Sequence, residues 1–147
     1  MRYVILFAAL LFSSVQAKAG STTDAMQAFG LVGTWAGECA LPASPANNHA
    51  IYSITPSGAA QLTNTFGEEY EDSVYNIVDA RLTVPGKFSM RQVLAKDESI
   101  VLDIVLLKED GKVRVWSSHT GDGKLLVKEG MIGPPVNRET RWVTHCK

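Results

Sequence analysis

Polar and apolar residues alternate in short runs from about position 33 to the end of the chain. The runs are about seven to ten residues long, rich in β-branched and aromatic side chains, and separated by residues that favour turns. This alternation predicts an all-β domain. We expect strands at approximately 33–41, 50–55, 59–66, 73–84, 88–95, 100–108, 112–120, 124–132 and 138–146.

Two turns join the later strands and set their register. Asp110 with Gly111, and Asp122 with Gly123, are pairs that favour two-residue type I′ hairpins. A turn of that type at Gly111 predicts three cross-strand pairs: Leu106 with Val115, Ile104 with Ser117, and Leu102 with His119. The apolar face of the sixth strand should point inward, so the side chains of Ser117 and His119 are expected on the inner face.

A short helical segment precedes the strands. Met26 and Phe29 recur at near-helical spacing, and Gly30 should end the helix, which we expect to plug one end of the sheet. Every later connection is short enough for an up-and-down meander, and closure removes the two edges of such a sheet. The pattern therefore predicts a closed up-and-down antiparallel barrel of about eight or nine strands. Its interior is either filled by side chains or open to one small ligand.

The first residues predict export. An unbroken apolar run of nine residues, 4–12, follows Arg2, and small residues suit cleavage after Ala17 or Ala19. The run is far shorter than the roughly 20 residues of a membrane-spanning helix, so no stable membrane anchor is expected. We therefore predict a signal peptide at 1–19, a single barrel domain at 20–147, and a periplasmic or secreted protein.

Charge and cysteines narrow the picture further. Cleavage after Ala19 removes two of the 14 basic residues and leaves 15 acidic ones, a formal net charge of −3, which argues against nucleic acid as a partner. The only cysteines are Cys39 and Cys146. In an oxidising compartment we expect them to form a disulfide that joins the beginning of the domain to its end.

Gly33, Thr34 and Trp35 resemble the opening of the calycins, the lipocalin, avidin and fatty-acid-binding group of up-and-down barrels. In that group a Gly-x-Trp sequence in the first strand follows a short helical turn. The resemblance implies that Trp35 closes one end of the barrel and that a late arginine packs across it. Arg141 is the best match for that arginine, with Arg138 as the second choice. It also implies a scaffold often used to bind apolar molecules.

Binding inside the barrel is the leading hypothesis, with a small apolar or amphiphilic ligand and no catalysis. An inward-facing Arg91 could read a ligand carboxylate, although cross-strand pairing on the outer face is the ordinary role for such a charge. The candidate lining residues are Trp35, Leu102, Ile104, Val115, Ser117, His119 and Arg91.

A protein-interaction or inhibitor module is the second hypothesis. The predicted register places Trp116 on the outer face beside Val105 and Leu107, and an exposed apolar patch often marks a partner surface. A small barrel enzyme is the third. Neighbouring strand residues point to opposite faces, so Ser118 does not easily meet His119, and no catalytic residue is assigned. The spacing of the three histidines favours loop or surface positions over a metal site, and no cofactor is expected.

Overall fold

The computed structural model describes residues 19–147, so the predicted signal peptide lies, apart from Ala19, outside the described residues. Those residues form one helix, α1 (Ala19–Phe29), and eleven strands. The strands are β1 (Gly33–Ala36), β2 (His49–Ile54), β3 (Ala60–Thr65), β4 (Ser73–Leu82), β5 (Lys87–Leu94), β6 (Val101–Glu109), β7 (Lys112–Thr120), β8 (Leu125–Lys128), β9 (Met131–Ile132), β10 (Arg138–Glu139) and β11 (Val143–Cys146).

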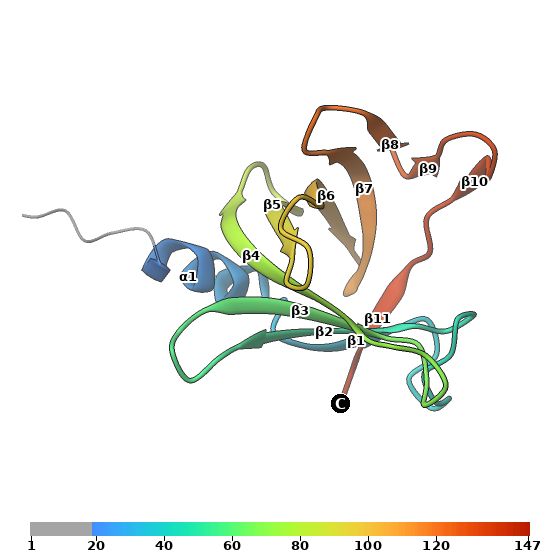
Figure 1. Cartoon of the computed structure of the whole chain (residues 1–147), viewed down its shortest axis with the longest axis horizontal. Coiled ribbons are helices and arrows are strands. Elements are labelled where there is room, and N and C mark those ends of the chain that lie inside the picture. The colour runs from blue at the N-terminus through green and yellow to red at the C-terminus, as the bar shows by residue number, and fades with distance from the viewer. Residues whose placement is uncertain (1–18) are drawn as a thin grey trace, which may run out of the picture.

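Eight of these strands close into an antiparallel barrel, which confirms the predicted fold. Each of β1 to β6 pairs with the next strand along the chain, β7 pairs with β11, and β11 returns to β1. The remaining strands, β8 to β10, continue from β7 as a small sheet outside the ring (Figure 1). We call the segment 125–140, which contains these three strands, the flap.

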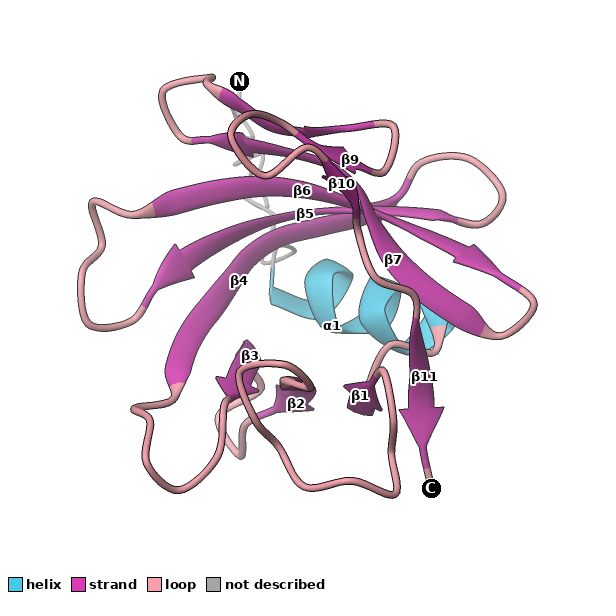
Figure 2. Cartoon of the chain, turned by 90° about the vertical axis from the view of Figure 1, so that its right-hand side faces the viewer, coloured by secondary structure: helices cyan, strands magenta, loops and turns pink. Residues whose placement is uncertain are grey.

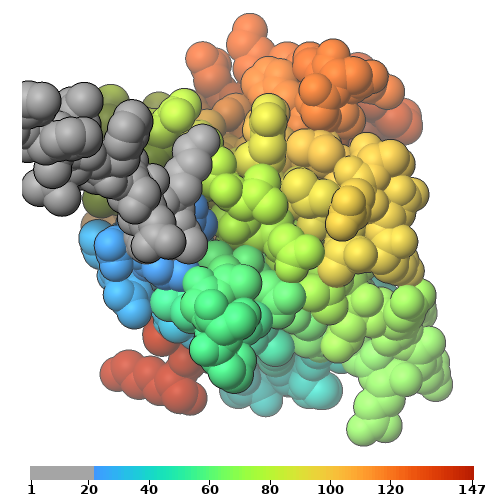
Figure 3. Space-filling view, turned by 60° about the vertical axis from the view of Figure 1, so that its left-hand side comes forward, coloured from blue at the N-terminus to red at the C-terminus, as the bar shows by residue number. Residues whose placement is uncertain are grey.

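Helix α1 plugs one end of the barrel, as predicted. Figure 2 looks into the ring of strands and shows the helix crossing its far end. Met26 and Phe29 are buried, and the Phe29 ring stacks on that of Phe88 from β5 at 5.1 Å between centroids. The space-filling view in Figure 3 shows the outer side of this end, where the helix (blue) meets the β2–β3 hairpin (green).

The end of α1 is fixed by backbone and charge. Gly30 has a φ of +69°, and its N–H donates to the Gln27 carbonyl while that of Leu31 donates to the Met26 carbonyl, both at 2.9 Å. This is a helix-terminating arrangement that glycine adopts without strain. Lys108 of β6 donates to the Phe29 carbonyl at 2.8 Å, which places a cation at the negative end of the helix and ties it to the barrel.

The disulfide between Cys39 and Cys146 is present, as predicted. It joins the loop after β1 to the last residue of β11, at the point where the barrel closes. Strand β11 pairs with β1 at three positions and with β7 at only two, Val143 with Val113 and Thr144 with Lys112. The covalent link therefore supports a short closing strand.

The predicted register between β6 and β7 is correct near the turn and wrong beyond it. Asp110 and Gly111 both have positive φ, and Leu106 lies opposite Val115 as expected. The register then shifts by one residue at a bulge, so that Ser117 lies opposite Val105. A shift of one residue reverses which side chains face the interior.

Because of this bulge, the predicted inward positions of Ser117 and His119 are wrong. Ser118 lies opposite the inward-facing Ile104 and is buried, whereas His119 lies opposite Asp103 on the outer face. Trp116 is the extra residue. Its carbonyl accepts a hydrogen bond of 2.7 Å from the N–H of Gly130 in the flap. The flap therefore takes up the backbone group that β6 leaves unpaired.

Three further details differ from the sequence-based expectation. The turn at Gly123 is not type I′, because Gly123 has positive φ and Asp122 does not. The predicted strand 124–132 is a tight hairpin of β8 and β9, in which Glu129 and Gly130 both have positive φ. The predicted strand 138–146 is interrupted between β10 and β11, where Thr140 hydrogen-bonds to the Gly130 carbonyl of the flap.

Candidate functional site

A cavity of about 340 Å³ lies inside the barrel and is the candidate site. Its wall contains four of the predicted lining residues, Trp35, Leu102, Ile104 and Val115. Alternation along β6 explains two of them, because Leu102, Ile104 and Leu106 point inward while the residues between them point outward. The size is near the lower end of the range of about 300–1,000 Å³ that is usual for ligand pockets.

The wall also carries polar groups that were not predicted. Gln92 on β5 is only 1% exposed, and Asn64 on β3 follows the inward-facing Leu62 by two positions. Tyr52 on β2 is buried as well. The alternation of Phe88, Met90 and Leu94 on β5 was the sequence signal for Gln92, because a polar residue stands between them on an otherwise apolar face.

Gln92 and Tyr52 have few partners within the described residues. The Gln92 amide donates only to the Sδ of Met90, at 3.3 Å, and its carbonyl oxygen accepts no hydrogen bond. The Tyr52 hydroxyl makes no hydrogen bond there either, and burial raises the pKa of Tyr52 well above its ordinary value. Both side chains line the cavity. Their free hydrogen-bonding capacity is thus available to a molecule inside it.

The side of the cavity between β7 and β11 is closed by the flap. After Val113 the two strands no longer pair, and the hydroxyl of Thr140 donates to the carbonyl of Val115 at 2.7 Å. Ile132 and Thr140 of the flap belong to the cavity wall together with Arg114. Here the barrel wall is built by side chains and a loop.

Arg114 lies in this seam with its guanidinium between two indole rings. The Cζ atom is 4.7 Å from the ring centroid of Trp142 and 5.5 Å from that of Trp116. Its closest carboxylate is that of Glu139, at 3.6 Å, and the Arg114 side chain is 14% exposed. The Nε atom is buried with no hydrogen-bond partner. Arg114 was not among the predicted site residues.

The predicted barrel-closing residues lie differently from the expectation. Trp35 is buried, and its indole N–H donates to the Leu31 carbonyl at 2.7 Å, close to the end of α1. The side chain whose ring meets it edge-on is His145, with 4.9 Å between ring centroids. The Arg141 guanidinium instead donates to the carbonyl of Ala46.

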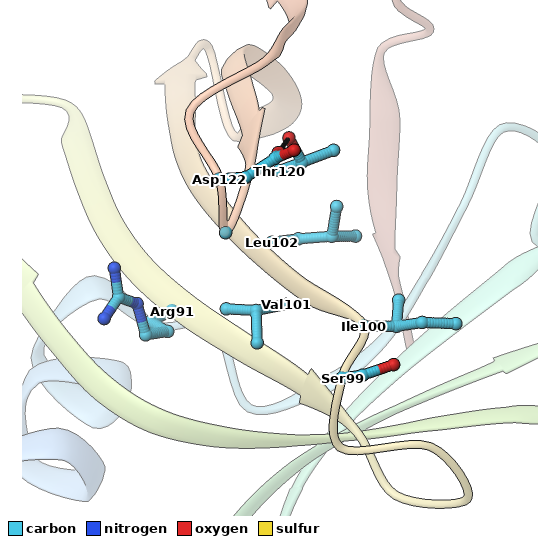
Figure 4. A pocket seen from close by; sticks show the side chains of 8 residues that line it. Arg91, Ser99, Ile100, Val101, Leu102, Thr120 and Asp122 are labelled. Carbon is cyan, nitrogen blue, oxygen red and sulfur yellow. Dashed lines mark hydrogen bonds between the residues drawn. The ribbon is translucent and has the colours of Figure 1, made fainter.

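Arg91 lies outside the cavity. It forms a two-bond ion pair with Asp103, at 2.8 and 2.9 Å, on the outer face of β5 and β6. The Arg91 hydrogen bond holds the pKa of Asp103 below its usual value. Figure 4 shows Arg91 and Val101 on one side of β6 and Leu102 on the other, around a surface pocket at the end of the strand. Arg91 is therefore part of a cross-strand pair, the ordinary alternative considered above.

The predicted interaction surface is partly covered. Trp116 is half-buried. Its ring centroid lies 4.8 Å from Lys87 Nζ and 5.5 Å from Arg114 Cζ. Val105 and Leu107 are half-buried too, as outer-face residues of β6. Cations over an indole leave little of it as an apolar patch. These residues give weaker support to a partner surface than the cavity gives to a ligand.

No cluster of three histidine, cysteine, aspartate or glutamate side chains suited to a metal ion occurs within residues 19–147. Within the same range no helix is long and apolar enough to cross a membrane. Comparison of the chain with protein-family models, with curated proteins and with solved structures finds no match.

Proposed function

We propose that this protein is a non-catalytic binding protein that acts outside the cytoplasm and holds one small apolar or amphiphilic ligand inside its barrel. The observation that carries the proposal is a cavity in which apolar side chains surround polar groups that retain unused hydrogen-bonding atoms. Trp35, Ile104 and Leu106 supply apolar surface. Gln92 and Tyr52 supply hydrogen-bonding atoms.

The energetics favour a ligand that has both a hydrogen-bonding group and an apolar body. Gln92 and Tyr52 are buried as residues, but Arg114 Nε is the one side-chain nitrogen or oxygen of the described residues that is fully shielded without a hydrogen-bond partner, so solvent in the cavity still reaches the unbonded atoms of Gln92 and Tyr52. A ligand that hydrogen-bonds to either group would replace that solvent and gain about 0.5–1.5 kcal/mol net. Its apolar body would gain about 25 cal/mol for each Å² removed from water. A purely polar solute would forgo this second contribution.

Two features support a place outside the cytoplasm. The disulfide between Cys39 and Cys146 is of the kind that persists in oxidising compartments. The apolar run near the beginning of the chain has the form of a signal peptide. A carrier or sensor of small molecules in the envelope or the medium fits both features.

Native mass spectrometry of the protein purified from a bacterial periplasm tests the proposal. We expect a native mass that exceeds the denatured mass by a few hundred daltons. Ala50 lines the cavity, so Ala50→Phe should reduce the bound fraction by filling it. Ala59→Phe, the same change at an exposed position of the β2–β3 turn, should leave the bound fraction unchanged.

If the added mass is equal in both variants, the ligand is bound elsewhere and the proposal is wrong. If the native protein carries no added mass, the purified protein is titrated with N-phenyl-1-naphthylamine, a neutral apolar fluorophore. We expect saturable binding that Ala50→Phe weakens. Absence of binding to the wild-type protein would also overturn the proposal.

A further inference from the structure

The charged residues of the cavity wall are all of one sign. Among the described residues that line the cavity, Arg114 and Arg141 are the ones with a charged side chain, and no aspartate or glutamate is among them. The protein as a whole carries slightly more acidic than basic residues. The positive lining is therefore local to the cavity.

Neither arginine is neutralised by a hydrogen-bonded carboxylate. Arg141 donates to a neutral backbone carbonyl, that of Ala46. Arg114 makes no hydrogen bond to any described residue, and its contact with Glu139 is 3.6 Å long. The Glu139 side chain is itself 73% exposed, so water screens its charge.

The surroundings of Arg114 hold its guanidinium in one place. The rings of Trp116 and Trp142 lie within 5.5 and 4.7 Å of Cζ. Gly130 of the flap is so close that a Cβ atom at that position would lie 2.8 Å from Cζ. A guanidinium fixed in this way retains its hydrogen-bond donors and loses little entropy when an anion binds.

We infer that the ligand carries an anionic group, and that Arg114 is the specificity-determining residue that binds it at the seam between β7 and β11. This inference rests on the proposed function and specifies its ligand class: an apolar body with a single carboxylate, sulfonate or similar oxyanion. The apolar body occupies the barrel interior against Ile104 and Val115. The anionic group lies beside the flap.

Two fluorescent probes that share one aromatic framework test the inference. 8-Anilinonaphthalene-1-sulfonate is the anionic probe, and N-phenyl-1-naphthylamine is its neutral counterpart without the sulfonate. We expect Arg114→Gln to weaken binding of the anionic probe by at least about tenfold, because charge-assisted hydrogen bonds are lost. Binding of the neutral probe should change by less than about twofold. The neutral probe also reports whether the variant still forms the cavity.

A second variant acts in the opposite direction. Glu139→Gln removes the carboxylate nearest to Arg114 at an exposed position, so it should tighten binding of the anionic probe and leave the neutral probe unchanged. Arg91→Gln is the matched control, since Arg91 lies on the outer face and should affect neither probe. Ala50→Phe should weaken both probes if they bind inside the barrel.

The outcomes separate the two proposals. If neither probe responds to Ala50→Phe, the cavity is not the binding site and the proposed function fails together with the inference. If the neutral probe responds to Ala50→Phe but Arg114→Gln weakens both probes equally, the cavity binds apolar molecules and only the role of Arg114 is wrong. Failure of Glu139→Gln to tighten the anionic probe would likewise count against Arg114 as the anion site.

Discussion

Removal of the disulfide is the perturbation whose effect follows most directly from the structure. Cys39 and Cys146 are separated by 107 positions, so the bond closes a loop that contains most of the domain. Chain-entropy estimates give about 4–5 kcal/mol of stabilisation for a loop of this length. A single domain of this size has a total stability of about 5–15 kcal/mol. We therefore expect Cys39→Ala/Cys146→Ala to lose a large part of its free energy of unfolding.

The loss should also have a local component in the closing strand. Strand β11 is held by three residue pairs with β1 and two with β7, whereas seven pairs join β5 to β6 alone. Without the covalent link, the C-terminal end of β11 should fray. Amide hydrogen exchange should rise in β11 and β1 and remain slow in β5 and β6.

Urea unfolding of the wild-type protein and the double variant measures the first effect. The variant should unfold at lower urea, and its m-value should rise because the unfolded chain is no longer cross-linked. A decrease in the free energy of unfolding of less than about 1 kcal/mol, with β11 still protected from exchange, would refute the reasoning. That result would mean that β11 and the flap close the barrel without help.

Three further predictions concern single residues. Gly33 has a φ of +128°, and a Cβ there would overlap the His145 imidazole. Gly33→Ala should therefore lower the free energy of unfolding more than Gly58→Ala, because Gly58 also has positive φ but lies in open space. Urea unfolding of the two variants measures the difference. The pKa of Tyr52 is raised in the folded state, so the contribution of Tyr52 to stability is fully present below about pH 10 and is lost as the pH rises above it. Tyr52→Phe should therefore make the free energy of unfolding fall less steeply with pH, by up to about 1.4 kcal/mol per pH unit. Unfolding measured at pH 9–11 tests this. The pKa of Asp103 is lowered, so its contribution to stability is present above about pH 4 and is lost as the pH falls through the folded-state pKa. The thermal unfolding temperature of Asp103→Asn should therefore depend less on pH below about 4. The effect should be small because the Asp103 side chain is 41% exposed.

Much of the barrel could be predicted because strand alternation is a local property. The predicted strand 112–120 coincides with β7, and the predicted strand 100–108 differs from β6 by one residue at each end. The pair Asp110 and Gly111 specifies a two-residue turn in its own sequence. Such features need no knowledge of distant parts of the chain.

The bulge at Trp116 depends on partners that local patterns do not specify. β7 pairs with β6 along its whole length, with β11 near its beginning and with β8 near its end. Where the neighbour changes, the Trp116 carbonyl bonds to Gly130, which lies 14 positions later. Counting residues from the turn cannot detect such a change. The predicted inward positions of Ser117 and His119 failed for that reason.

Gln92 and Arg114, two polar residues of the candidate site, differ in the same way: a local pattern identifies the first, and only distant contacts identify the second. Gln92 could have been selected from sequence, since it interrupts the inward apolar series of β5. Arg114 could not, because alternation assigns it to the outer face opposite Leu107, where a charge is ordinary. It belongs to the cavity wall because the flap and Trp142 cover that face and the ladder between β7 and β11 is incomplete. An unusual charge at this site is therefore a consequence of tertiary structure, and it marks the part of the barrel wall where binding specificity is most directly tested.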